Sequence, residues 1–449
     1  MSGTLLASRA ILVIALMVGV EIAVGTVTAG DVELTPMGSV AAGNVDGSIP
    51  AWSPITTKGT PRAVNPYAQE QPVLTVTAAN AAQYSALLAP SQKVRLERYP
   101  GYRMPVYPSH RGATFPDWFL DATRDNEQRV KLTADGQGFA GTAMGYPFRR
   151  PRSGVEALWN HVVRYNTSGF RGYLSTAVSL PGAGFDLERR YLEFAFWYNR
   201  RDAQPESVKP RNLSFLSKII DPPVKAGTGD LVRLPLNRFA TAVEAWIFLP
   251  QSGRVYRGPD NGYDTPFNDG LMTFDQVDMF NGPTDRYQLE LVGQREMLVP
   301  YNTYALYSDK LKYGQIMGDG HLRPEVLRYE KHRVWVIDAR LKSGMKHLYG
   351  RRTLYLDEDT WAVLVQDLYD AQGQLIRGAE AYPVPYPDQS VTLLGVQLFD
   401  DFKLGRFALM NLTNEEDEFP EFGWHPPSNN YFMPSNLTRF TQTKHKTRS

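Results

Sequence analysis

Apolar and polar residues alternate along three consecutive segments between residues 333 and 370. In the first segment Trp335 and Ile337 point to one side of an extended chain and Asp338 points to the other, because successive side chains of a strand alternate. Turn-forming residues separate the segments, and strands joined by short turns are antiparallel neighbours. The pattern predicts an antiparallel meander with one apolar face and one solvent-facing face. A helix, a second sheet or a ligand must cover the apolar face.

Similar strand patterns occur on both sides of the meander. The candidate strands, including the meander, are residues 172–178, 190–198, 242–249, 253–256, 287–292, 333–341, 349–357, 361–370, 375–382 and 393–404. Neither a repeat nor a low-complexity linker interrupts this series. We therefore predict an α+β, mainly β fold, in which a single domain spanning residues 30–449 has one large sheet with helices on one side.

Helical patterns are few and short. The clearest is residues 154–164, where Val155, Leu158 and Val162 recur at helical spacing. The other predicted helices are residues 77–94, stopped by Pro90, then 115–129, 212–220 and 273–279. A Pro- and Gly-rich stretch, about residues 30–75, predicts an extended arm anchored by Trp52, and about residues 414–449 predict an irregular tail.

The first 29 residues have the pattern of a signal peptide. Arg9 precedes an apolar run over residues 10–20, and Val27-Thr-Ala29 has the small residues of a cleavage site. We expect the mature chain to begin at Gly30 or Asp31. The chain has no cysteine, which excludes disulfides, thiolate metal sites and the lipid-bearing N-terminal cysteine of a lipoprotein.

Charge and motifs exclude several functions. The formal net charge is +1, which provides no electrostatic attraction for nucleic acid. Residues 136–141 match the dinucleotide fingerprint by letter, but Pro147 interrupts the helix that should follow. The seven histidines lack metal-ligand spacing, and neither a phosphate-binding loop nor a nucleophile elbow is present. We therefore predict no cofactor, no metal and no nucleic-acid partner.

Two carboxylate-based alternatives remain open. Five aspartates between Asp260 and Asp278 would suit calcium, although aspartate is also an ordinary turn residue. Paired carboxylates for glycoside hydrolysis are compatible with any large β protein, and the pattern selects no pair. An enzyme that acts on the cell envelope through such a pair is one alternative function.

The apolar faces of the predicted strands are the candidate binding surface. Aromatic residues make up 12% of the chain, which favours strands and surfaces that bind apolar ligands. A curved sheet closed by helices can enclose a cavity for such a ligand. The candidate cavity-lining residues are Trp197, Trp246, Phe248, Tyr287, Leu289, Leu291, Trp335, Ile337, Leu354 and Leu356.

Several motifs resemble a bacterial family of unknown function labelled outer-membrane lipoprotein-sorting proteins, which is related to LolA and LolB. They are Leu34-Thr-Pro-Met-Gly38, Asp46-Gly-Ser-Ile-Pro-Ala-Trp52, Val106-Tyr-Pro-Ser-His-Arg111, Ala245-Trp-Ile-Phe-Leu-Pro250, Tyr263-Asp-Thr-Pro266, Asp278-Met-Phe-Asn-Gly-Pro-Thr-Asp-Arg-Tyr287 and Pro300-Tyr-Asn302. The resemblance covers nearly the whole mature chain.

The resemblance implies a half-open antiparallel β-barrel with helices covering its concave face. It also implies a periplasmic, non-enzymatic carrier or chaperone that binds a lipid acyl chain or another hydrophobic ligand, for transport to the outer membrane. An inner-membrane efflux-type transporter and an outer-membrane protein are the implied partners, and the resemblance implies no catalytic residues. An outer-membrane assembly factor without a ligand is the other alternative function.

Overall fold

One sheet of sixteen strands forms the body of the protein. Fourteen strands follow in the order β1-β2-β14-β15-β16-β17-β18-β19-β5-β6-β7-β8-β9-β10, while β13 pairs with β14 and β20 with β5. Its pairings are antiparallel apart from one parallel contact between β2 and β14. The computed structural model describes residues 33–53, 64–182, 184–259, 262–416, 418–428 and 430–444. The predicted signal peptide with its cleavage site, and Asp260, lie outside them.

The elements have the following limits. The strands of the large sheet are β1 Leu74–Val76, β2 Met104–Val106, β5 Gly169–Ser179, β6 Phe185–Phe196, β7 Leu213–Asp221, β8 Gly229–Leu234, β9 Glu244–Leu249, β10 Arg254–Arg257, β13 Tyr287–Pro300, β14 Tyr329–Leu341, β15 Arg351–Asp357, β16 Val363–Tyr369, β17 Leu375–Tyr386, β18 Val391–Asp401, β19 Arg406–Leu412 and β20 Glu421–Phe422. Two small hairpins pair β3 Lys131–Leu132 with β4 Phe139–Ala140, and β11 Pro266–Phe267 with β12 Met272–Thr273. The α-helices are α1 Pro90–Arg98, α2 Asp117–Arg129, α3 Gly154–Val162, α4 Pro205–Val208, α5 Tyr313–Ile316 and α6 Pro434–Gln442. The 3₁₀ turns are η1 Ala81–Leu87, η2 Trp197–Asn199, η3 Phe274–Gln276, η4 Tyr304–Tyr307, η5 Pro324–Val326 and η6 Pro387–Gln389.

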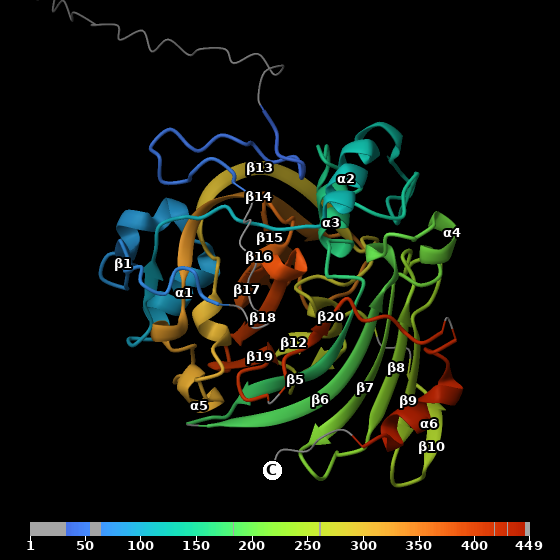
Figure 1. The fold of residues 1–449 in the computed structure, drawn as a ribbon. Helices are drawn as coiled ribbons and strands as arrows, with labels where there is room; N and C mark the ends of the chain where they lie inside the picture. The colour runs from blue at the N-terminus through green and yellow to red at the C-terminus, as the bar shows by residue number, and fades with distance from the viewer. Residues whose placement is uncertain are drawn as a thin grey trace, which may run out of the picture.

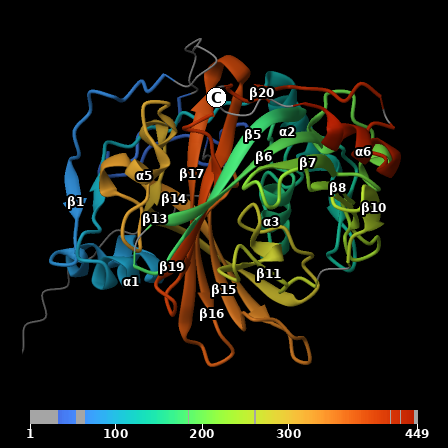
Figure 2. The same cartoon turned by 90° about the horizontal axis from the view of Figure 1, so that it is seen from below.

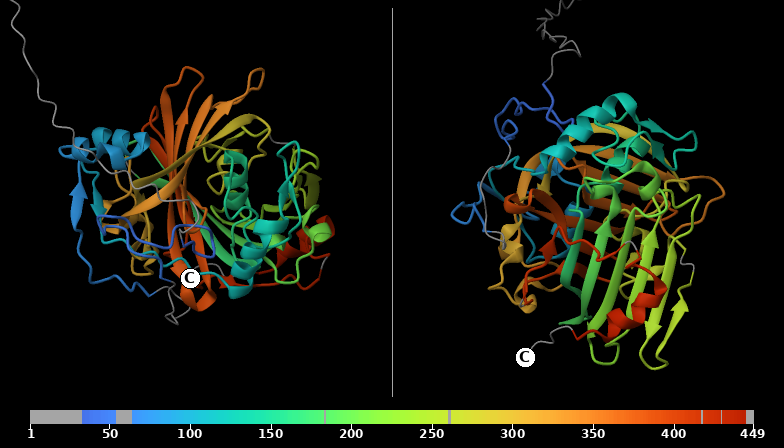
Figure 3. Two further views of the ribbon diagram at one scale, coloured as in Figure 1. Left: turned by 90° about the horizontal axis from the view of Figure 1, so that it is seen from above. Right: turned by 45° about the vertical axis from the view of Figure 1, so that its right-hand side comes forward.

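The sheet is strongly curved, as the resemblance predicted (Figure 1). Register shifts interrupt several ladders, for example between Leu291 and Gly293 and between Tyr382 and Val384. Such bulges add a residue to one strand and bend it. Figure 2 shows the two halves of the sheet, β14–β17 and β5–β10, set at an angle with α3 between them. The concave side therefore carries α3, and α6 lies on the outer side of β7–β9 (Figure 3).

The meander is confirmed, but its predicted solvent-facing side is wrong. β14 pairs with β15 and β15 with β16, and every residue of β15 after Arg351 is buried. Asp338, on the side opposite Ile337, is only 6% exposed. The reason differs along this side: α1 packs on β16, where the backbone N–H of Ser91 donates to Asp367, whereas Asp338 is covered by Arg340 and Arg351, at 2.8 and 2.6 Å.

Four predicted elements differ from the structure. The helix predicted over residues 273–279 is only the 3₁₀ turn η3. Residues 212–220 were predicted as a helix, but Leu213–Asp221 is strand β7, central between β6 and β8. Pro90 was predicted to stop a helix, but it begins α1, where a proline fits because the first N–H of a helix needs no partner. The tail was predicted to be irregular, but residues 434–442 form α6, whose Leu437 is fully buried against the sheet.

Candidate functional site

A row of apolar side chains crosses the concave side of β5–β9. Phe170 lies opposite Phe194, Phe194 opposite Phe215, Phe215 opposite Val232 and Val232 opposite Ala245. Directly opposed residues share a face of the sheet. With Phe196 and Leu213, which form the neighbouring row, these residues are called the apolar band.

The apolar band is only half-buried, in contrast to the other face of the same strands. All seven of its residues keep part of their surface accessible. On the opposite, convex face Leu216 and Leu231 are fully buried in a cluster with Leu437 and Phe440 of α6. The convex face is thus closed by a helix of the chain itself, whereas the concave face retains an apolar surface that the described residues leave partly uncovered.

The ten predicted cavity-lining residues fall into two groups. Seven lie on the concave side of β13–β15: Tyr287, Leu289, Leu291, Trp335, Ile337, Leu354 and Leu356. Six of them pack into or beside the main core with α2 and α3, whereas the hydroxyl of Tyr287 donates to the carbonyl of Tyr349. The other three lie on the convex side under α6: Trp197, Trp246 and Phe248. None of the ten belongs to the apolar band.

Sequence reasoning missed the band, although one signal was present. Phe194 and Phe196 alternate with Glu193 and Ala195 in a segment that was predicted as a strand. Their neighbour Phe215 lay in the segment predicted as a helix, so the row across the strands could not be assembled.

The loop that follows β10 is held inside the concave side by arginines. Residues 262–286 are called the plug loop. Asp275 pairs with Arg352 of β15 at 2.5 Å, and Asp269 lies 3.2 Å from Arg406 of β19. Another aspartate of the predicted calcium group, Asp278, pairs with Arg164. The structure therefore directs these three carboxylates to three different arginines rather than toward one another.

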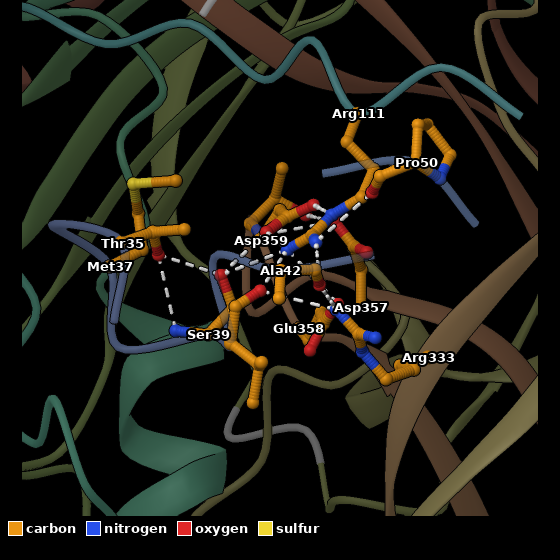
Figure 4. A network of polar contacts seen from close by, with 12 residues as sticks. Thr35, Met37, Ser39, Ala42, Pro50, Arg111, Arg333, Asp357, Glu358 and Asp359 are labelled. Carbon is orange, nitrogen blue, oxygen red and sulfur yellow. Dashed lines mark hydrogen bonds and ion pairs between the residues drawn. The ribbon is translucent and has the colours of Figure 1, made fainter. Parts of the chain in front are cut away.

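The N-terminal arm, residues 33–53, is attached to the body by a buried network of charges (Figure 4). Arg111 donates two hydrogen bonds to Asp359, at 2.8 and 2.9 Å, and lies 3.1 Å from Glu358. Ser39 of the arm donates to the same Asp359 at 2.6 Å. Arg333 donates to Glu358 at 2.8 Å and to the carbonyl of Ala42.

This network contains one carboxyl group in excess. Among the described residues, Glu358 and Asp359 pair with two guanidinium groups, those of Arg111 and Arg333, whereas Asp357 accepts hydrogen bonds from the hydroxyls of Tyr301 and Thr360. Burial raises the pKa of Asp357 to about 6. Burial, with the charge of Asp359 beside it, raises the pKa of Glu358 to about 8. The network therefore retains a proton under conditions in which an exposed carboxyl group would lose it.

We expect Asp357→Asn to flatten the dependence of stability on pH. A carboxyl group with a raised folded-state pKa keeps a proton that the unfolded chain releases, so stability is highest below its ordinary pKa of 3.8 and falls as pH rises to about 6. The amide mimics the protonated form, so the variant should be more stable than the parent at pH 7 by roughly 3 kcal/mol. Urea unfolding at pH 4.5 and pH 7 measures this. The exposed control Asp319→Asn should show the same change in stability between the two pH values as the parent. If Asp357→Asn also showed that same change, the raised pKa of Asp357 would be contradicted.

A second cluster of paired carboxylates lies under α1, on the convex side. Arg95 binds Glu380 at 2.7 Å and Asp400 at 2.5 Å, and none of the three is more than 1% exposed. Tyr329 and Tyr382 each donate a hydrogen bond to Glu380. These carboxylates are enclosed by an arginine and tyrosines, away from the apolar band.

Comparison with known proteins shows the family. A family model described as protein of unknown function (DUF1329) matches residues 75–438. The uncharacterized protein PA3922 of Pseudomonas aeruginosa is 38% identical over 409 residues, which are 89% of this chain and 90% of that protein.

Two solved structures are more distant. A DUF1329 family protein from Desulfovibrio piger is 14% identical, covers 63% of this chain and 95% of its own, and has a TM-score of 0.42. An outer membrane lipoprotein-sorting protein domain from Vibrio parahaemolyticus is 14% identical, covers 64% and 99%, and has a TM-score of 0.44. The family match spans most of the chain, which confirms the family predicted from the motifs. The chain belongs to the DUF1329 family.

Proposed function

We propose that this protein is a non-enzymatic periplasmic carrier or chaperone that binds a lipid acyl chain or another hydrophobic ligand against the apolar band. The observation that carries the proposal is the contrast between the two faces of β5–β9. α6 closes the convex face, while Phe170, Phe194 and Phe215 remain half-buried on the concave face. An apolar surface that is curved inward and left partly open is a binding surface for an apolar ligand.

The dimensions of the band suit an extended chain. It crosses five strands, so its length is roughly 19 Å at a strand spacing of about 4.8 Å. Each methylene group that the ligand buries contributes about 0.8 kcal/mol. The aromatic rings provide much of this contact area.

The proposed location rests on the N-terminal sequence. Residues 1–29 have the pattern of a cleavable signal peptide, and the absence of cysteine excludes a lipidated N-terminal cysteine. Within the described residues, the structure contains no helix with the length and apolar character that a membrane crossing requires. The family resemblance implies an inner-membrane efflux-type transporter and an outer-membrane protein as partners, and we propose the same partners here. We propose that the protein transports its ligand to the outer membrane.

Native mass spectrometry of protein purified from its own periplasm, followed by lipid extraction, tests the carrier. We expect a bound apolar molecule in stoichiometric amount. A mass without any addition, in a protein that also fails to take up a fluorescent fatty-acid probe, would exclude the carrier. If the protein instead cleaved cell-envelope glycan or lipid, the hydrolase alternative would replace it.

We expect Phe194→Asp to weaken binding of the fatty-acid probe at least tenfold. Losing a buried phenylalanine contact costs about 1.5–3 kcal/mol, and 1.4 kcal/mol corresponds to a factor of ten. Probe titration by fluorescence gives the dissociation constant. The control is Phe239→Asp, which changes a phenylalanine that is 60% exposed and outside the band. Equal affinity of the two variants would show that the ligand does not touch the band.

A further inference from the structure

A cleft of about 890 Å³ opens beside the end of β17. One wall of the cleft is formed by η4 and α5. The other wall is formed by the segment that follows β19 and includes β20, residues 413–416 and 418–424, which is called the strap. Tyr307, Tyr386 and Phe419 are among its lining residues. Its volume lies in the range of about 300–1,000 Å³ that is usual for small-molecule sites. No residue of the apolar band lines it.

A continuous row of rings nevertheless joins this cleft to the apolar band. Ring centroids are 5.5 Å apart for Tyr386 and Phe419, 5.5 Å for Phe419 and Phe422, and 6.1 Å for Phe422 and Phe170. Phe170 then contacts Phe194 at 5.8 Å. The four phenylalanines are only half-buried, so one partly accessible aromatic surface leads from the cleft onto the band.

The cleft has positive charge available for a ligand. Lys310 and Arg323 line it and are exposed, and no ion pair of either is found among the described residues. Arg323 uses Nε to donate to the carbonyl of Met317. The cleft is also lined by two acidic residues. Glu325 is engaged by Arg103 at 2.6 Å and is stabilised by the charge of Arg323 as well, and Asp309 has an interaction of its own, so a ligand anion would compete with Glu325 for Arg323 and meet Lys310 directly.

We propose that the cleft binds the anionic headgroup of an amphiphile whose hydrocarbon chain lies along the ring row on the apolar band. This inference rests on the proposed function, because it assigns the second end of the same ligand. Two cations beside an apolar path favour a carboxylate or a phosphate attached to a chain. The ligand class is then an anionic single- or double-chain lipid rather than a neutral hydrocarbon.

The experiment compares probes that share a chain and differ in charge. Fluorescent cis-parinaric acid and its methyl ester are titrated into the full mature chain, and lysophosphatidic acid and monoacylglycerol compete for the probe. We expect the acid to bind more tightly than the ester. In the double variant Lys310→Glu with Arg323→Glu, the affinity for the acid should fall roughly tenfold, to that for the ester, because two attractive charges become repulsive. Binding of the ester should not change.

The control is the double variant Lys403→Glu with Arg201→Glu, which makes the same change in net charge at two exposed residues that do not line the cleft. If lysophosphatidic acid binds more tightly than the fatty acid, the headgroup is a phosphate. If the fatty acid binds more tightly, the headgroup is a carboxylate. Either result supports the proposal. Equal binding of acid and ester, an unaffected Lys310/Arg323 variant, or displacement of the probe by inorganic phosphate alone would overturn it. Failure of the parent to bind any probe would instead reject the carrier itself.

Discussion

Replacing Arg95 with methionine is expected to lower the free energy of unfolding at pH 7 by about 3–5 kcal/mol. Arg95 is completely buried and is the guanidinium partner of both Glu380 and Asp400. Without it, two carboxylates remain in the core with only neutral donors such as Tyr329 and Tyr382. Urea unfolding followed by tryptophan fluorescence measures the loss.

The dependence on pH identifies the cause of this loss. Burial already raises the pKa of Asp400. In the variant the folded state should therefore keep a proton that the unfolded chain releases, and stability should fall as pH rises above the ordinary range near 4. The deficit should be smaller at pH 5 than at pH 7. Adding Glu380→Gln and Asp400→Asn should restore much of the stability, because no charge is then left unpaired.

Arg98 provides the matched control for Arg95. It lies one turn further along α1 and is exposed, so Arg98→Met should change the free energy of unfolding by less than about 0.5 kcal/mol. A similarly small effect of Arg95→Met would show that the buried cluster contributes little to the stability of the fold.

Replacing Trp361 with alanine is expected to cost about 3–5 kcal/mol and to loosen the N-terminal arm. The side chain is fully buried and stacks on Trp335, with ring centroids 6.0 Å apart. Its indole N–H donates to the carbonyl of Met37 in the arm at 3.1 Å, and Met37 itself is fully buried. The alanine variant thus removes a large part of the core and one of the hydrogen bonds that join the arm to the body.

Urea unfolding gives the cost of Trp361→Ala, and limited proteolysis reports on the arm. Cleavage within residues 33–53 should be faster in the variant under native conditions. Trp361→Phe separates the two contributions, because it keeps a ring but leaves the Met37 carbonyl unpaired, at a cost of about 1–3 kcal/mol. An arm that resists proteolysis equally in all three proteins would show that other contacts, such as that of Ser39 with Asp359, hold it.

The elements that local pattern could predict are those with a strong period. The meander follows from alternation around Trp335 and Ile337, and α3 follows from apolar residues at helical spacing. The helix predicted over residues 115–129 is present as α2, which begins at Asp117. β7 was misassigned because its short apolar segment around Phe215 has no decisive period, and pairing with β6 and β8 on both sides makes it a strand.

The charge clusters could not be predicted from local pattern. Arg95 and Asp400 are 305 positions apart, and Arg111 and Asp359 are 248 apart. Nothing near Arg95 in the chain distinguishes it from the exposed Arg98, since the contact exists only when α1 packs on β17 and β18. Asp338 was likewise predicted to face solvent, but it is buried because the side chains of Arg340 and Arg351 fold onto it when β14 and β15 pair.

The sequence by itself determined the family, the mainly β class and the alternation of side chains within each strand. Only the tertiary structure decided which alternating set faces inward. In β9 the larger rings of Trp246 and Phe248 suggested the cavity, but they lie under α6, and the smaller Ala245 faces the concave side. Alternation divides the residues of a strand between two faces but does not show which face is the concave one. The placement of α6, which comes from the far end of the chain, closes one face and leaves the apolar band partly open on the other.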